Sequence, residues 1–176
     1  MLPSSRPTLR AACKQYGPGR LPRADRPDIG AGYAAASAAV LATVLFGAVL
    51  SVSALRGPSG DWIVSLLFPA LAIPIVAPAA FLLGVVGWRL SSPTTAVSGL
   101  VVGGAGAIGT YLVSLLVVGS VLTAEVVLSP GGGTLVDAAE TSVGIVVLAF
   151  LLTWWITVPV GCLSGFVYVN VTENAT

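Results

Sequence analysis

The chain has 176 residues, of which 56% are hydrophobic and only 9% are charged, whereas an ordinary soluble domain carries roughly 25% charged residues. Such a chain cannot cover a folded surface with polar groups, which argues against a water-soluble domain and predicts a membrane protein. The formal net charge is +1 and there is no His, which excludes imidazole-bound haem, His-Glu-x-x-His zinc sites, histidine proton shuttles and Ser-His-Asp triads.

Residues 1–28 are rich in Pro, Arg, Gly and Ser and show no apolar period, so we predict a flexible, basic, cytoplasmic tail. The prolines in this segment leave a recognition peptide as an alternative. Six of the eight Lys and Arg residues lie in this tail: Arg6, Arg10, Lys14, Arg20, Arg23 and Arg26.

Four apolar runs follow, at about 29–55, 62–90, 93–128 and 138–169. Each exceeds the roughly 20 residues that cross a bilayer core as a helix. We therefore predict an all-α membrane protein with four transmembrane helices, short loops, no soluble domain, and a short C-terminal tail at 170–176. The residues that we expect to cap the four helices are Asp28, Asp61, Ser92 with Pro93 at the first helical position, and Asp137 with Glu140 in a capping box.

The distribution of basic residues predicts the orientation of the chain. The basic tail and Arg89 lie inside and only Arg56 lies outside if both termini are cytoplasmic, which satisfies the positive-inside rule. We therefore expect a multi-pass protein of the cell membrane. Two features leave alternatives open: residues 52–54 (Val-Ser-Ala) resemble a signal-peptide cleavage site, and Asn170 and Asn174 begin glycosylation sequons.

Residues 104–109 (Gly-Ala-Gly-Ala-Ile-Gly) match the G-x-G-x-x-G fingerprint of dinucleotide-binding folds. The fingerprint needs a preceding strand, a helix with a water-facing side, and an acid at the end of the next strand. Residues 110–124 carry no charge, and Glu125 precedes the apolar residues that would form the second strand. We therefore predict that no nucleotide and no nucleic acid binds here.

A membrane helix explains the same glycines as a packing surface. At 100° per residue, five small side chains of the third run fall within an arc of about 80°, and two of them form a G-x-x-x-G pair. The fourth run contains a second such pair. The candidate helix-packing residues are Gly99, Gly103, Gly106, Thr110, Ser114, Gly161 and Gly165.

Interior prolines of the second and fourth runs are the remaining unusual feature. Interrupted helices indicate transporter sites when they recur in two halves of a chain. Here the two halves share a Gly/Pro loop that ends in Asp, but Pro69, Pro74, Pro78 and Pro159 do not match in position. We therefore interpret them first as structural bends.

The sequence supports two function hypotheses of different classes. The first is a non-catalytic accessory or structural component of a membrane assembly, whose partners are the lipid bilayer and other membrane subunits or a second copy of the chain. The alternative is a small oligomeric transporter or channel for an uncharged or weakly charged solute. An enzyme is not expected, because no nucleophile and base occur at a recognisable spacing, and we expect no cofactor and no metal.

Overall fold

The structure is a computed structural model, and it describes residues 21–23, 26–56, 62–129 and 133–173. Most of the basic tail predicted at 1–28 lies outside the described residues. The same is true of Asp61 and of residues 174–176 of the C-terminal tail.

Four long helices account for nearly all of the described chain. They are α2 (Pro27–Arg56), α3 (Trp62–Ser91), α4 (Ala96–Leu128) and α5 (Leu135–Glu173). Each contains a stretch long and apolar enough to cross a membrane. The four predicted helical runs are confirmed, and the chain has the architecture expected of a multi-pass membrane protein.

The start of α4 differs from the predicted one. Ser92 and Pro93 were expected to open this helix, but Ser92 follows the end of α3 with a φ of 38°, and the N-cap is Thr95. The Thr95 hydroxyl accepts the Ser98 N–H at 3.2 Å, and the Ser98 hydroxyl accepts the Thr95 N–H at 3.1 Å. This reciprocal pair satisfies two amides that the first turn leaves unpaired, so the helix begins later than Pro93.

The caps of α5 and α2 also differ from those predicted. Asp137 is the third residue of α5 rather than its cap: its carboxylate accepts the Thr134 N–H at 2.8 Å, and the Thr134 hydroxyl accepts the Asp137 N–H at 3.2 Å. Asp28 lies inside the first turn of α2, which begins at Pro27, where a missing amide hydrogen costs nothing. These three helices therefore begin two or three residues away from the predicted positions.

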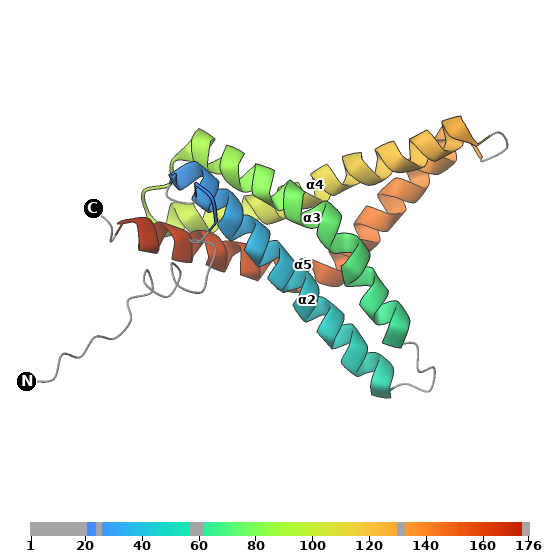
Figure 1. Ribbon diagram of the computed structural model, residues 1–176, viewed down its shortest axis with the longest axis horizontal. Helices are drawn as coiled ribbons and strands as arrows, with labels where there is room; N and C mark the ends of the chain where they lie inside the picture. The colour runs from blue at the N-terminus through green and yellow to red at the C-terminus, as the bar shows by residue number, and fades with distance from the viewer. Residues whose placement is uncertain (1–20, 24–25, 57–61, 130–132, 174–176) are drawn as a thin grey trace, which may run out of the picture.

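The helices form two hairpins, the first made of α2 and α3 and the second of α4 and α5 (Figure 1). Helix α2 also contacts α5, and α3 contacts α4. The hairpins lie together at one end, where α2 and α4 begin and α3 and α5 finish, and they diverge toward the other end (Figure 1). We refer to the first of these as the closed end and to the second as the splayed end.

Both hairpins are held by the same close helix crossing. A Cβ added at Gly84 of α3 would lie 2.8 Å from the Ala31 oxygen and 2.8 Å from the Ala35 Cβ of α2. A Cβ added at Gly161 of α5 would lie 2.9 Å from the Gly103 oxygen and 2.8 Å from the Ala107 Cβ of α4. Ala31 of α2 therefore corresponds to Gly103 of α4, and Ala35 corresponds to Ala107. The number of residues between the two members is the same in both pairs.

A second pair of contacts follows the same correspondence. Gly47 of α2 lies against Pro69 of α3, and Gly119 of α4 lies against Ser142 of α5. Gly47 and Gly119 keep the spacing that relates Ala31 to Gly103. On α3 and α5 the contacting residues do not keep one spacing, so the likeness of the two hairpins is closest along α2 and α4; both hairpins point in the same direction (Figure 1).

The glycine fingerprint lies entirely within α4. Residues 97–102, which would have to form the strand of a dinucleotide-binding unit, are helical. The prolines of α3 and α5 are also accommodated inside continuous helices, and Pro69 is buried against α2. The local structure on which a nucleotide-binding loop depends is thus absent from this part of the described chain.

Candidate binding cavity between the two hairpins

A cavity of about 310 Å³ lies between the hairpins and is lined by residues of all four helices. We call it the central cavity. It exists because the facing helix surfaces consist largely of Ala and Gly, which leave space where larger side chains would interdigitate. Its volume falls at the lower end of the range for small-molecule sites and is about twice that of a cavity that binds benzene.

The two hairpins contribute corresponding positions to the lining. Most lining residues of α2 have a counterpart in the lining on α4, at the spacing that separates Ala31 from Gly103. Several lining residues of α3 have a counterpart on α5, at the spacing that separates Gly84 from Gly161. The corresponding pairs that differ in chemistry are Ala38 with Thr110, Ala39 with Tyr111, Ala42 with Ser114, Val76 with Thr153, and Ala80 with Thr157. In each of these pairs the hydroxyl belongs to the second hairpin.

Three of these hydroxyls form a cluster on the second hairpin. The Tyr111 hydroxyl lies 2.6 Å from the Thr153 hydroxyl and 2.7 Å from the Thr157 hydroxyl. The Tyr111 ring also packs edge-on against Phe150, with centroids 5.1 Å apart, which fixes its direction. Thr153 and Thr157 lie one turn apart on α5 and so present their hydroxyls to the same ring. We call Tyr111, Thr153 and Thr157 the hydroxyl cluster.

Aromatic side chains bound the cavity at the closed end. Trp88 and Tyr168 line the cavity and pack edge to face at a centroid distance of 4.9 Å. The Tyr168 hydroxyl donates to the Pro27 carbonyl at 2.7 Å, which ties α5 to the start of α2. These contacts join three helices across the end of the cavity.

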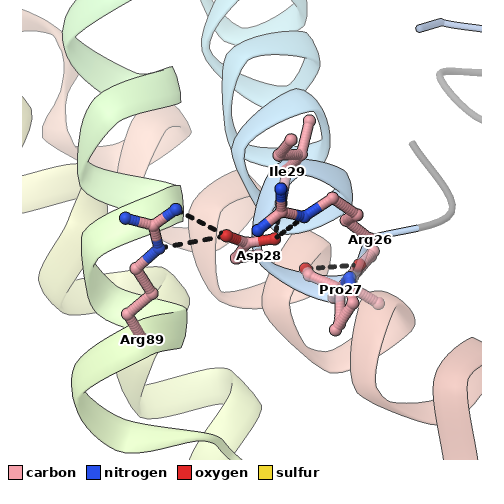
Figure 2. Close-up of polar contacts among 6 residues, drawn as sticks. Arg26, Pro27, Asp28, Ile29 and Arg89 are labelled. Atoms are coloured by element: carbon pink, nitrogen blue, oxygen red, sulfur yellow. Dashed lines mark hydrogen bonds and ion pairs between the residues drawn. The ribbon is translucent and has the colours of Figure 1, made fainter. Parts of the chain in front are cut away.

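An ion pair reinforces the closed end just beyond the aromatic residues. One carboxylate oxygen of Asp28 accepts from the Arg89 Nε at 3.0 Å and from an Arg89 terminal nitrogen at 2.7 Å, as Figure 2 shows. Its other oxygen accepts the Ile29 N–H at 3.0 Å and lies 3.6 Å from the Arg26 Nε. Asp28 therefore links the beginning of α2 to the end of α3 (Figure 2).

The chemistry of the central cavity is neutral. Among the residues that the structure describes, its lining contains hydroxyls and one indole but no acidic or basic side chain. No group of three or more metal-ligating His, Cys, Asp or Glu residues occurs in the same described ranges. The cavity is thus suited to holding a molecule by apolar contact and a few hydrogen bonds.

The structure separates the predicted packing residues into two groups. Gly99 and Gly103 of α4 lie directly against Gly165 and Gly161 of α5, within one chain. A Cβ at Gly99 would lie 2.7 Å from the Gly165 oxygen, and one at Gly103 would overlap the Gly161 oxygen. All seven predicted residues border the central cavity, but Gly106, Thr110 and Ser114 do so without taking part in this glycine crossing.

Sequence reasoning missed the hydroxyl cluster and the Asp28–Arg89 pair. Thr153 and Thr157 are spaced one helical turn apart in an apolar run, a signal that was readable, but nothing in the sequence placed Tyr111 beside them. The partners in the ion pair belong to different helices. The sequence had already explained Asp28 as a helix cap and Arg89 as an orientation signal, so nothing in it pointed to a contact between them.

Comparison of the chain with known protein families, with curated proteins and with solved structures finds no match.

Proposed function

We propose that this chain is a small membrane carrier that binds an uncharged or weakly charged solute in the central cavity. The observation that supports this most directly is the position of the cavity at the interface between two similar hairpins. Transporters built from parallel repeats bind their substrates at the repeat interface, near the middle of the membrane. Tyr111 lies about 22 Å along a helix of about 50 Å, which places the hydroxyl cluster close to that depth.

The two ends of the molecule differ in the way that a carrier requires. The closed end is held by the Trp88–Tyr168 contact and by the ion pair between Asp28 and Arg89. At the splayed end the hairpins diverge (Figure 1). Rocking of one hairpin against the other would exchange these two arrangements, which is the motion that repeat-built carriers use.

The proposal is tested by filling the cavity without disturbing helix packing. Gly106 lines the cavity and an added Cβ there meets no atom within 4 Å, so Gly106→Leu adds its side chain at a cavity-lining position that has open space. Gly144→Leu is the matched control, because Gly144 is exposed on α5 and its added Cβ also meets nothing within 4 Å.

The assay is stopped-flow light scattering of proteoliposomes with glycerol and 1,2-propanediol as osmotic probes. We expect faster solute entry than in protein-free liposomes, a loss of most of this difference with Gly106→Leu, and no loss with Gly144→Leu. Entry at the protein-free rate for the unmodified chain, or equal rates for the two variants, would contradict the proposal.

The accessory-subunit hypothesis assigned the glycine pairs to contacts with a partner. Gly99, Gly103, Gly161 and Gly165 contact each other within the chain, so they no longer favour a partner over a monomeric bundle. That hypothesis stays a prediction, and co-purification of foreign membrane proteins with the tagged chain in mild detergent is the measurement that supports it.

A further inference from the structure

The hydroxyl cluster carries more short contacts than it has hydrogens. The three hydroxyl groups supply three hydrogens, but there are four contacts and each of them requires its own hydrogen. Tyr111 contacts Thr153 at 2.6 Å and Thr157 at 2.7 Å, while Thr153 reaches the Ala149 carbonyl at 2.7 Å and Thr157 reaches the Thr153 carbonyl at 3.1 Å. Since each hydroxyl donates one hydrogen, one of the four contacts has none.

The distances indicate which contact lacks a hydrogen. The Thr157 contact with the Thr153 carbonyl is the longest, so Thr157 turns its hydrogen to Tyr111. Tyr111 then donates to Thr153, and Thr153 donates to the Ala149 carbonyl. Every hydrogen of the cluster is committed in this chain of donors, and the Thr157 oxygen accepts none.

The cluster therefore offers acceptors to the cavity and no donor. An anionic ligand would meet lone pairs without a compensating charge, because the described lining contains no basic side chain. A cation would find no carboxylate. A neutral ligand that brings its own O–H or N–H satisfies the free oxygen of Thr157.

A second polar group lies nearby on the same helix. Ser114 follows Tyr111 by three residues, so both face the same side of α4, and both line the cavity. The Ser114 hydroxyl makes no hydrogen bond to another residue of the described chain, so it is free to donate to a ligand oxygen. A ligand hydroxyl, which donates and accepts, matches the two groups together.

The opposite wall is apolar. At the positions that correspond to Thr110, Tyr111 and Ser114, the first hairpin carries only alanine. The one hydroxyl that α2 contributes, Thr43, donates to the Ala39 carbonyl of its own helix at 2.8 Å. A ligand is thus oriented with its polar end toward the second hairpin and its apolar body toward the first.

We infer that the central cavity selects a neutral amphiphile of about two-ring size, an alcohol or phenol, whose O–H donates to the hydroxyl cluster and whose apolar body lies against the first hairpin. The size follows from a volume of about 310 Å³, about twice that of a cavity that binds benzene. This inference rests on the proposed function, since it requires that the cavity binds a solute.

The test is equilibrium binding to the full chain in lipid nanodiscs, with empty nanodiscs subtracted, using three probes with one ring system. These are 2-naphthol, 2-methoxynaphthalene, which lacks the donor, and 2-naphthoate, an anion. We expect saturable binding of 2-naphthol about tenfold tighter than that of 2-methoxynaphthalene, and no saturable binding of 2-naphthoate. Similar affinities for 2-naphthol and 2-methoxynaphthalene, or absence of saturable 2-naphthol binding, would overturn the inference.

Matched variants locate the donor contact. Thr157→Val keeps the shape of the side chain and should weaken 2-naphthol binding about tenfold without changing 2-methoxynaphthalene binding. Thr141→Val, a control on the exposed surface of α5 outside the cavity lining, should change neither probe. Equal effects of Thr157→Val and Thr141→Val would count against the assignment.

The same experiment distinguishes failure of the inference from failure of the proposed function. One outcome is that 2-naphthol and 2-methoxynaphthalene bind equally well to the unmodified chain and that Gly106→Leu abolishes the binding of both. The cavity is then a binding site, and only the inferred preference for a hydrogen-bond donor is wrong. If Gly106→Leu changes no binding at all, the cavity is not the site and both proposals fail.

Discussion

Two glycines of α4, three residues apart, provide the sharpest test of the packing described above. A Cβ at Gly103 would overlap the backbone oxygen of Gly161 and lie 3.2 Å from the Gly165 nitrogen. Both neighbours are backbone atoms, so no flexible side chain can move aside and α4 must separate from α5. A Cβ at Gly106 meets nothing within 4 Å.

The two substitutions should change the free energy of unfolding in opposite directions. Overpacking a close contact costs about 1–3 kcal/mol, so Gly103→Ala should destabilise the protein by about that amount. Gly106→Ala introduces no clash and replaces a helix-interior glycine, so it should stabilise the protein by about 0.5–1 kcal/mol. The free energies of unfolding of the two variants should therefore differ by about 1.5–4 kcal/mol.

The assay is reversible unfolding in mixed micelles by titration with sodium dodecyl sulfate, followed by tryptophan fluorescence. The α4–α5 crossing would be refuted by a Gly103→Ala variant within about 0.5 kcal/mol of the unmodified chain, the range of a surface substitution. Equal destabilisation by Gly103→Ala and Gly106→Ala would refute the assignment of Gly106 to the cavity.

Three further predictions use the same preparations. Thr95→Ala should lower the free energy of unfolding by about 1 kcal/mol through loss of the α4 cap, and Ser92→Ala by less; the reverse order in the same titration would restore the cap predicted from sequence. Asp28→Arg and Arg89→Asp should each lower the melting temperature in detergent, and the double exchange should recover part of the loss; additive losses would show that the pair does not join α2 to α3. With native cysteines replaced, a membrane-impermeant maleimide should label Ser129→Cys on intact cells and Ser92→Cys only after permeabilisation, whereas the opposite pattern would invert the predicted orientation.

The number and approximate position of the helices follow from the sequence because each apolar run satisfies its own backbone hydrogen bonds; α5 extends beyond its predicted bounds at both ends, to Leu135–Glu173. A helix in lipid needs no neighbour for this, so composition and turn residues are sufficient to locate it. The glycines of α4 were also readable as a small-residue surface, because their spacing places them on one side of a helix. The helix starts were less readable: Thr95 and Thr134 displaced the expected caps, since several polar residues in each loop compete for the same amides.

The partners of each helix surface were decided only by the tertiary structure. These helices are apolar on every side, so their sequences do not distinguish a surface that faces lipid from one that faces another helix. A Cβ at Gly103 would meet the Gly161 backbone while one at Gly106 would meet no atom within 4 Å, although both glycines belong to one stripe. The meeting of Tyr111 with Thr157 across the second hairpin likewise depends on the rotation of α4 against α5, which is set by the steric fit of the glycine crossing rather than by any local pattern.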